Sequence, residues 1–495
     1  MSLKHRIRRV AAGGGILVLA LAGVLGSTSA ASATGYPVVP DTNGTLTIHK
    51  HVKDEEHSTP GNPAGAPLNG VGFSVQKVGK TNGAACDPID LTTPAGWESV
   101  TAALAAFVPA SGTLPAGFCA DGAASTVTTQ APNGTAVINP AKGFYLVMET
   151  TPGDHLITEK AAPFLVTVPM PVPGAAGAAG TWNFNVHTYP KNVLGTFTPV
   201  KTVAASNEGA TPLVPGAIVP WTIETTIPKA DFAYTTVKVT DTPAAGHVFN
   251  AWTEARLNGN LLNGPGTPTP DYAVSGGELT LTGPGLAKVN AITGGANATL
   301  TVKLTTEVTA TDMGSFANNA NVTLNSTTVP VTPPQTNWGK LVITKHKAGN
   351  EQATIAGARF AVYPKTSVGL ECVASDVTGT PAWSTPATPD PSDAVQTAVL
   401  WISNTALGAP IGSKDYCLKE TQAPTGYVLD STPRKVTISS TTVAAQYKFP
   451  NVEVPNPPLP LTGGAGAMAF GLIGFGLIGA AGALFAVRRS QAAKR

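Results

Sequence analysis

The sequence predicts an all-β protein built from tandem β-sandwich domains. The chain is rich in Thr, Val, Ala, Gly and Pro, and only 12% of its residues are charged. Short strand-like runs recur roughly every 8 to 15 residues, among them TLTIHKHV (45–52), FYLVMET (144–150) and LVITKHK (341–347). No long stretch places its apolar residues at helical spacing. Together these features favour β-sandwiches joined end to end.

Residues 1–33 predict a secretory signal peptide. A basic start that includes Arg8 and Arg9 precedes an apolar run too short to span a membrane comfortably. Small residues then end at Ala33, where we expect cleavage. The mature chain is therefore predicted to be exported.

The first predicted domain covers residues 34–192 and ends in the segment WNFNVHTYPKN (182–192). Trp182, Phe184 and Val186 alternate with polar residues, which is typical of a strand with one buried face. Pro190 lacks a backbone donor, so we expect the strand pairing to stop there. Lys191 would then lie at the rim of the domain with its amine reachable from outside.

An internal repeat relates the first predicted domain to the third, at residues 336–458. TIHKH (47–51), GVGFSV (70–75) and YLVMETTP (145–152) recur in order as ITKHK (343–347), GARFAV (357–362) and YCLKETQAP (416–424). Proline-rich seams near 193–199 and 329–336 bound a middle domain, residues 193–335, that lacks the repeat. We expect two sandwiches of one type on either side of a different one.

Four cysteines in an exported chain indicate two disulfides. Three pairings are open on the sequence alone. Pairing that is local in sequence is favoured, with Cys86 bonded to Cys119 in the first domain and Cys372 to Cys417 in the third.

The C-terminus combines a short motif, an apolar span and a basic tail. LPLTG occupies 459–463, residues 464–487 form the predicted membrane span, and 488–495 are basic. The 23 uncharged residues from Ala465 to Val487 would reach about 35 Å as a helix, enough for a bilayer. The basic tail is expected to stay in the cytoplasm.

The ectodomain between these ends is mildly acidic, although the whole chain carries a formal charge of +2. Eight basic residues and no acids lie in the two end segments, which leaves 23 basic against 29 acidic residues, a net charge of −6. Such a surface gives no electrostatic reason to expect nucleic acid as a partner.

Three motifs together resemble those of one family. LPLTG with its span and tail resembles the cell-wall sorting signal of Gram-positive surface proteins, YCLKETQAPTGY (416–427) resembles the E-box of pilins, and W…YPK resembles the pilin motif. The outer domains are similar to collagen-binding-protein B-type domains. The whole chain resembles the shaft subunit of a sortase-assembled pilus of the corynebacterial and Actinomyces type. That resemblance implies three tandem Ig-like domains and a surface pilus attached to the cell wall.

The resemblance also implies how subunits are joined. A class C sortase would cleave the motif Leu459, Pro460, Leu461, Thr462 and Gly463 after its threonine and hold Thr462 as a thioester. The amine of Lys191 in another subunit would attack that thioester and form an amide. The implied partners are identical subunits, pilus-specific and housekeeping sortases, minor tip and base pilins and peptidoglycan, with host surface proteins or glycans as candidate targets.

The family further implies intramolecular Lys–Asn isopeptide bonds. The reaction needs a lysine kept neutral by burial, an asparagine carboxamide and a buried protonated acid that polarises it, and one apolar pocket produces both protonation states. The expected sets are Lys50, Glu149 and Asn192 in the first domain, Lys201, Asp241 and Asn318 in the middle domain, and Lys345, Glu420 and Asn451 in the third. Asn321 remains an alternative to Asn318.

Other function classes find little support. The eight histidines show no HExxH pattern, no GxSxG occurs and no acid pair suggests hydrolysis, so we expect no enzyme beyond single-turnover self-crosslinking, and neither cofactor nor metal. A monomeric wall-anchored adhesin is the alternative to a shaft subunit. An adhesin would have no use for Lys191 as an acceptor.

Overall fold

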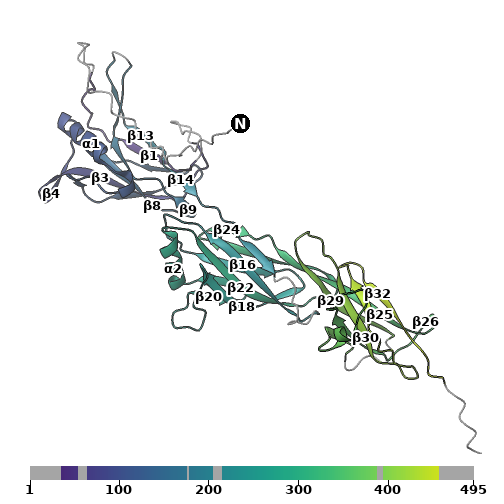
Figure 1. Cartoon of the computed structure of the whole chain (residues 1–495). Coiled ribbons are helices and arrows are strands. Elements are labelled where there is room, and N and C mark those ends of the chain that lie inside the picture. Colours follow the sequence, from purple (N-terminus) through teal and green to yellow (C-terminus); the bar gives the residue numbers. More distant parts are fainter. Residues whose placement is uncertain (1–34, 54–63, 176–177, 204–213, 387–393, 456–495) are drawn as a thin grey trace, which may run out of the picture. The chain divides into compact units, whose positions relative to one another are not determined.

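The computed structural model describes residues 35–53, 64–175, 178–203, 214–386 and 394–455 (Figure 1). The predicted signal peptide, the LPLTG motif with Thr462 and the predicted membrane span lie outside these ranges. Within them, no helix is both long and apolar enough to cross a membrane. The chain divides into two compact units. One contains the residues up to Gly339 together with Trp401–Ser413, and the other contains Lys340–Leu400 and the residues from Lys414 onward.

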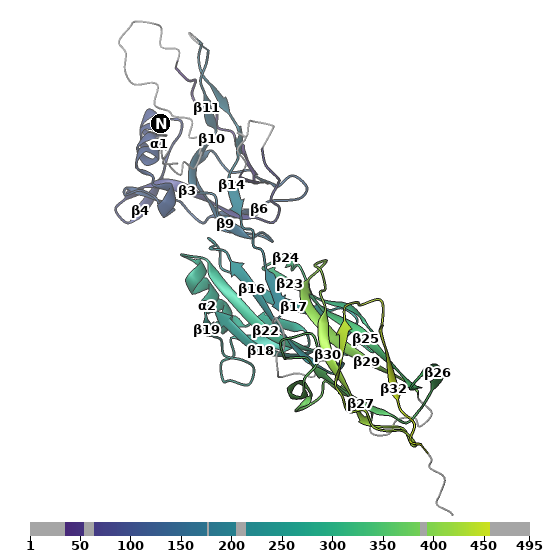
Figure 2. The ribbon, with the colours of Figure 1, turned by 45° about the vertical axis from the view of Figure 1, so that its right-hand side comes forward.

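The predicted all-β class is confirmed, with two α-helices in the described ranges that the sequence analysis did not anticipate, α1 (Pro94–Ala106) and α2 (Gly283–Thr293). Helix α1 begins after Thr93, whose hydroxyl accepts the Gly96 N–H at 3.1 Å. Val100 and Ala103 of this helix are buried in a cluster with residues of strands β3 (Gly72–Asn82) and β8 (Gly143–Thr151). Figures 1 and 2 show α1 alongside β3. Small residues dominate α1, which hides its apolar stripe in the sequence.

The N-terminal part of the first unit is a sandwich with short additional ribbons. Its strands are β1 (Thr45–His49), β2 (His51–Val52), β3 (Gly72–Asn82), β4 (Ala85–Pro88), β5 (Phe118–Ala120), β6 (Ser125–Thr128), β7 (Thr135–Ile138), β8 (Gly143–Thr151), β9 (Ile157–Glu159), β10 (Phe164–Val168), β11 (Met170–Val172), β12 (Thr181–Asn183), β13 (Asn185–Thr188) and β14 (Lys191–Leu194). The sheet orders are β13-β1-β7, β10-β8-β3-β4 and β2-β14-β9.

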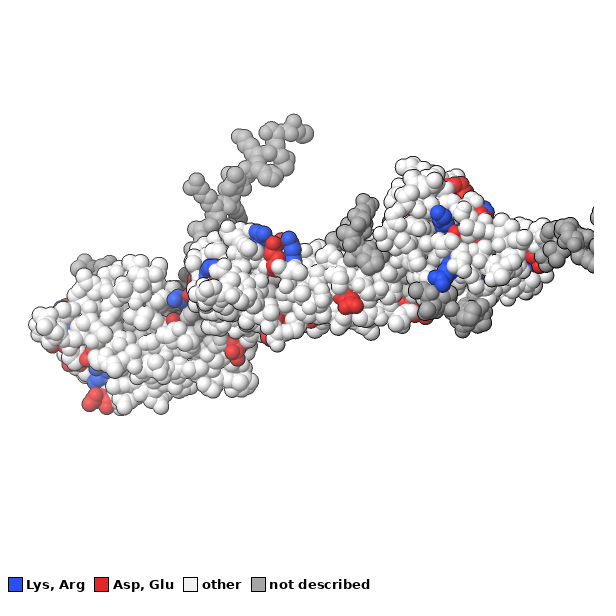
Figure 3. Space-filling model, turned by 90° about the horizontal axis from the view of Figure 1, so that it is seen from below, with Lys and Arg blue, Asp and Glu red and all other residues white. Residues whose placement is uncertain are grey.

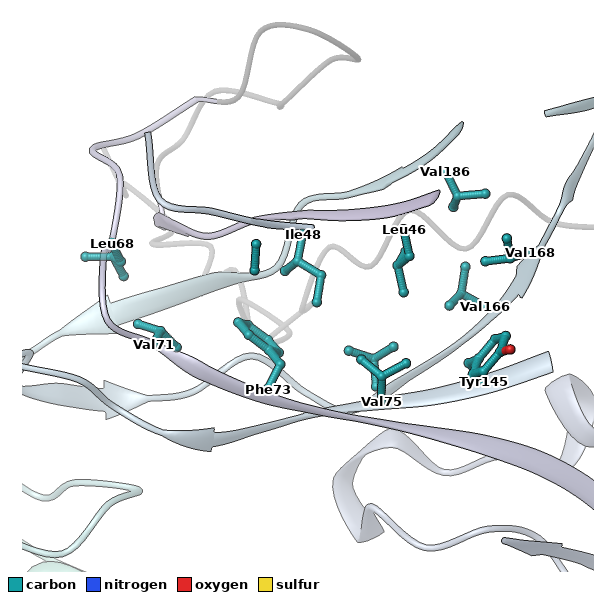
Figure 4. Packing of buried hydrophobic residues seen from close by; sticks show 12 residues of the cluster. Leu46, Ile48, Leu68, Val71, Phe73, Val75, Tyr145, Val166, Val168 and Val186 are labelled. Atoms are coloured by element: carbon teal, nitrogen blue, oxygen red, sulfur yellow. The ribbon is translucent and has the colours of Figure 1, made fainter. Parts of the chain in front are cut away.

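Two of these sheets face each other across an apolar core. Figure 4 shows Leu46 and Ile48 of β1 pointing toward Phe73 and Val75 of β3, with Val186 of β13 in the same core. All five are at most 3% exposed. The period-2 alternation of these strands therefore has its expected cause, one face against the core and one against solvent.

The segment expected as one strand ending at Pro190 is instead divided, which corrects the prediction. β12 and β13 are separate strands, and the second ends at Thr188, two residues before Pro190. Pairing resumes at once, because Lys191 is the first residue of β14, which lies between β2 and β9. Lys191 is half-buried, and the strand that it begins is the central strand of its three-stranded sheet.

The following part of the first unit is a second sandwich. Its strands are β15 (Val200–Val203), β16 (Ile218–Ile227), β17 (Val237–Pro243), β18 (His247–Leu257), β19 (Asn260–Leu261), β20 (Tyr272–Ser275), β21 (Glu278–Leu281), β22 (Ala298–Val308), β23 (Gly314–Leu324) and β24 (Thr327–Pro330). One sheet has the order β15-β16-β22-β18-β19, and in the other β20-β21-β17-β23 are neighbours. In β22, Leu300, Val302 and Leu304 alternate inward with at most 1% exposure.

The remaining strands lead into the second unit. They are β25 (Pro334–Lys347), β26 (Asn350–Thr354), β27 (Arg359–Pro364), β28 (Trp383–Ser384), β29 (Val395–Ala406), β30 (Lys414–Gln422), β31 (Arg434–Ile438) and β32 (Ala445–Asn451). β28-β27-β30-β31 form one sheet. In the other, β25 and β32 pair in parallel from Leu341 opposite Ala445 to Lys347 opposite Asn451. The first and last strands of this unit are thus direct neighbours.

Both predicted disulfides are confirmed, Cys86–Cys119 and Cys372–Cys417, with Cα atoms 5.9 and 5.8 Å apart. The first connects β4 and β5, which both pair with β3. Gly79 of β3 makes room for it, because a Cβ there would lie 2.7 Å from the Cys86 sulfur. On the chain-entropy estimate, each bridge stabilises by roughly 3 to 4 kcal/mol.

The low charged fraction of the sequence is visible on the surface. On the face shown in Figure 3, Lys and Arg side chains are few and are interspersed with Asp and Glu. That face carries no extended patch of one sign among the described residues.

Candidate functional site

Three lysines are buried in the described chain, each beside an acid and near an asparagine. Lys50, Lys201 and Lys345 are 0%, 4% and 1% exposed. Burying an ammonium is costly unless it is paired or loses its proton, so such lysines mark sites with a special role. These are the three sets expected from the sequence.

The set in the second unit has all three members in contact. Lys345 lies on β25, Asn451 on the adjacent β32, and Glu420 on β30 of the facing sheet. The Lys345 Nζ donates to Asn451 Oδ1 and lies 3.3 Å from Glu420 Oε1. Asn451 Nδ2 donates to Glu420 Oε2 at 3.0 Å. The carboxyl group therefore contacts both nitrogens, that of the amine and that of the carboxamide.

The surroundings hold this second-unit set in place. Asn451 Nδ2 also donates to the Val428 carbonyl at 2.9 Å, and the Asp430 N–H donates to Glu420 Oε2 at 2.9 Å. The Lys345 Nζ lies 4.4 Å from the ring centroid of Phe449. Burial lowers the pKa of Lys345, although Glu420 opposes this shift. The lowered pKa favours the neutral, nucleophilic amine.

In the middle set, the lysine and the acid are in direct contact and the asparagine lies alongside. Lys201 of β15 is ion-paired with Asp241 of β17, and its Nζ donates to the Asn319 carbonyl at 3.3 Å. Asn318 of β23 is fully buried, yet neither atom of its amide makes a normal hydrogen bond to a described residue. Asn318 nevertheless lies close enough to the Asp241 carboxyl to lower the pKa of that carboxyl, against the larger opposite effect of burial.

Protonation states in this middle set follow from burial. Burial lowers the pKa of Lys201 to about 8, against the opposing effect of Asp241. Burial also raises the pKa of Asp241 above its ordinary value, against the opposing effect of Lys201. Both shifts favour a neutral amine beside a protonated acid, the pair of states that a Lys–Asn crosslinking reaction would require.

The alternation of β23 separates the two candidate asparagines. Asn318, Ala320 and Val322 alternate inward and are 0–2% exposed. Asn321 lies on the other face of the strand, half-buried and opposite Thr240 of β17. The geometry favours Asn318 as the partner of Lys201.

The first-domain set also comes together. Lys50 lies between β1 and β2, Asn192 on β14, and Glu149 on β8. The Lys50 Nζ donates to Asn192 Oδ1 and lies 2.8 Å from Glu149 Oε2, while Asn192 Nδ2 donates to Glu149 Oε1 at 2.6 Å. Burial lowers the pKa of Lys50 to about 8, against the opposing effect of Glu149. The arrangement matches that in the second unit.

Two further features of these sets were not foreseen. Each lysine lies near an aromatic ring, with centroid distances of 5.8 Å from Lys50 to Phe73 and 5.3 Å from Lys201 to Trp221, in addition to that to Phe449. In the first domain the Ala161 N–H also donates to Asn192 Oδ1, at 2.7 Å. Phe449 lies two residues before Asn451, so period-2 spacing could have placed its ring on the same face as Asn451. No local sequence signal indicated that the Ala161 N–H would bind Asn192.

One cluster has the composition of a metal site but not its chemistry. Suitable atoms of Cys372, Asp376 and Cys417 lie within 4.8 Å of one another. Both sulfurs belong to the disulfide and so are not thiolate ligands. Asp376 instead accepts backbone N–H groups of Ser367 and Val373 at 2.7 and 2.9 Å and orders the disulfide-bonded loop.

Comparison with known proteins gives consistent matches along the chain. Residues 41–193 match the family model of the Gram-positive pilin subunit D1, N-terminal domain, and residues 339–452 match that of the prealbumin-like fold domain. The fimbrial subunit type 2 of Actinomyces naeslundii is 29% identical, over 99% of this chain and 97% of the relative. The fimbrial subunit type 1 of Actinomyces viscosus is 27% identical, over 96% of each chain.

Among solved structures, the full-length major pilin SpaD from Corynebacterium diphtheriae is similar. It is 25% identical, and the match covers 83% of this chain and 98% of that one with a TM-score of 0.47.

Proposed function

Since this chain is a Gram-positive pilus subunit by its resemblance to fimbrial proteins over nearly its whole length, we propose that it forms the shaft of a covalent surface pilus. The proposed linkage joins Lys191 of one subunit to Thr462 of the next through a class C sortase. Lys–Asn isopeptide bonds would stiffen each subunit. A housekeeping sortase would transfer the finished polymer to peptidoglycan, and minor pilins would occupy tip and base.

The observation that carries the proposal is the set of three buried Lys–acid–Asn clusters. A folded protein gains little from burying a lysine beside an amide, because a hydrophobic replacement of similar size is often as stable. The burial is useful if the lysine reacts. Each bond would connect strands of one sandwich, and in the second unit it would link the first strand to the last.

The geometry suggests how the acid takes part. A neutral Lys345 Nζ would attack the Asn451 Cγ, and the nitrogen would lose a proton as the new C–N bond forms. Glu420 contacts that nitrogen and also Asn451 Nδ2, so it can pass a proton from the first to the second. The old C–N bond then breaks and ammonia leaves. The acid was expected to polarise the carboxamide, whereas these contacts favour proton transfer to its leaving nitrogen.

The two levels of crosslinking would have separate tasks. Lys191 and Thr462 would determine how many subunits are joined, while the internal bonds would determine how each subunit resists force and protease. Adhesion and colonisation would follow from a long fibre that survives mechanical load, and no ligand pocket is needed for that role.

An immunoblot of cell-wall extract boiled in SDS tests the shaft proposal. A ladder of high-mass bands is expected, because amide bonds survive boiling. A single band at the mass of the monomer would instead support the alternative, a monomeric wall-anchored adhesin. The same blot from cells without the pilus sortase should show monomer alone.

A further inference from the structure

Lys191 has a histidine directly opposite it on the neighbouring strand. In the parallel pair β2–β14, Lys191 lies opposite His51, and Asn192 lies opposite Val52. Residues directly opposite in a ladder emerge on the same face, and neighbouring strands are only about 4.8 Å apart. A lysine side chain is longer than that spacing, so its amine can reach the ring.

The His51 ring is held in a tautomer that leaves one nitrogen available as a base. His51 Nδ1 lies 2.7 Å from the Gly65 carbonyl oxygen, which can only accept, so Nδ1 carries the proton. Nε2 then carries a lone pair. Nε2 is buried and has no hydrogen-bond partner among the described residues, in a side chain that is only 5% exposed. A buried acceptor without a partner is unfavourable unless it has another use.

The other histidine of the HKH run differs in this respect. His49 Nε2 is 2.8 Å from His187 Nδ1, and the His49 ring stacks on Tyr189 with centroids 4.8 Å apart. Its hydrogen bond therefore goes to another ring. His49 provides a matched control two residues away from His51.

We propose that His51 is the general base that activates Lys191 for subunit linkage. This inference rests on the proposed function, in which Lys191 attacks an acyl-sortase thioester. His51 Nε2 takes a proton from the Lys191 ammonium, and the resulting amine attacks the thioester carbonyl. The C–N bond forms as the C–S bond breaks, and the second proton that the nitrogen loses passes to the leaving thiolate. The imidazolium gives its proton back to solvent, so the step is balanced.

The other titratable groups near this face are few. His49 precedes His51 along the chain, and His187 and Tyr189 precede Lys191. Glu159 of β9 lies opposite Val193. Glu159 is within 3.7 Å of the Lys53 amine. Both of these charges belong to exposed side chains that are screened by water, whereas His51 is buried.

The test measures acylation of Lys191 in the purified ectodomain by the pilus sortase, with an LPLTG peptide as donor. Initial rates are followed by mass spectrometry from pH 6 to 10 for wild type, His51→Asn and His49→Asn. Asparagine keeps a donor near the Gly65 carbonyl but is not a base. His51→Asn should react about 100-fold more slowly near pH 7 and recover at alkaline pH, where hydroxide can remove the proton instead. His49→Asn should stay within about 2-fold of wild type.

The wild type provides a second readout that needs no substitution. Its rate should stay nearly level toward alkaline pH, because a base within the protein already removes the ammonium proton. A wild-type rate that climbs steadily to pH 10 would overturn the role of His51. So would a His51→Asn rate equal to wild type, or one reduced by the same factor at every pH, which would indicate a role in folding alone.

Failure of the underlying function is recognised separately. Lys191→Ala is included, and acylation of that variant at an unchanged rate would reject Lys191 as the acceptor and with it the linkage proposal. Loss of acylation in Lys191→Ala together with an unaffected His51→Asn would reject only the base. The Lys50–Asn192 crosslink, read from intact mass, reports whether each variant has folded.

Discussion

Lys191 and Asn192 are consecutive residues of β14 and therefore face opposite sides of the strand. Asn192 is fully buried and accepts a hydrogen bond from Lys50, whereas Lys191 is half-buried on the side of His51. One dipeptide thus carries both proposed reactions. A bond at Asn192 would tie β14 into the core, so force entering through Lys191 would meet a strand that is already crosslinked.

Replacing Lys191 by Ala should abolish the SDS-resistant ladder and leave the monomer attached to the wall, because the variant lacks the acceptor amine but keeps LPLTG. The measurement is an immunoblot of cell-wall extract. Lys53→Ala, which removes an exposed lysine near the same edge, is the control and should polymerise normally. A persistent ladder in Lys191→Ala would mean that another lysine is the acceptor.

Intact mass should reveal the internal crosslinks. Each Lys–Asn bond releases ammonia, so the purified ectodomain should weigh about 17 Da less per bond than its disulfide-bonded sequence. The first and third clusters have all members in contact, and in the middle cluster Asn318 lies beside Asp241, so three losses are expected. Asn451→Ala should lose one of them and keep the others. An ectodomain at its unmodified mass would reject the crosslinks altogether.

The sequence carried the local part of this arrangement. Alternation in TLTIH and the continuous apolar run in FYLVMET were enough to predict strands. The repeat of IHKH as ITKH aligned Lys50 with Lys345, and the repeat of ETT as ETQ aligned Glu149 with Glu420. Alternation also favoured Asn318 over Asn321. These signals are short-range, since they depend only on which face of a strand a residue occupies.

What the sequence could not supply was the pairing of distant segments. The bond from the Ala161 N–H to Asn192 needs a loop to approach β14 from 31 residues away. The resumption of pairing at Lys191 depends on β2 and β9 as neighbours, and Pro190 alone suggested the opposite. Helix α1 was missed because Ala and Gly residues give it a weak apolar stripe.

The middle domain should become pH-dependent when its crosslink is blocked. Asn318→Ala keeps Lys201 as a free amine whose folded-state pKa is lowered to about 8 by burial, below its unfolded value of about 10.4. Between these values the unfolded state binds the extra proton, so the free energy of unfolding should rise with pH, by at most about 1.4 kcal/mol per unit. The stabilisation present at pH 10.5 is lost as pH falls toward 8.

Wild type is the control for this dependence, since an amide nitrogen at Lys201 no longer titrates. Its thermal midpoint should change little from pH 8 to 10 relative to Asn318→Ala, as followed by circular dichroism. Parallel slopes for the two proteins would show that Lys201 is unreacted in wild type or that its pKa is not lowered.

Glu420→Ala should leave Lys345 and Asn451 adjacent but unreacted, because no group remains to carry the proton from the amine to the leaving nitrogen. Glu420→Gln should fail in the same way while it keeps the shape of the side chain. Both variants should lack one ammonia loss, about 17 Da. Glu453→Ala is the control, since it removes only an exposed partner of Lys347, a type of pair that contributes about 0–1 kcal/mol.

Mechanical pulling should distinguish these variants most clearly. Lys345 and Asn451 lie on the first and last strands of their unit and are separated by 106 positions. In wild type an amide between them would carry the load directly, and the chain between them would stay folded. In Glu420→Ala that chain can unravel and release up to roughly 3.3 Å per residue, whereas Glu453→Ala should extend like wild type. Equal extension of wild type and Glu420→Ala would mean that the bond is absent or forms without Glu420, and the role assigned to this acid would then be wrong.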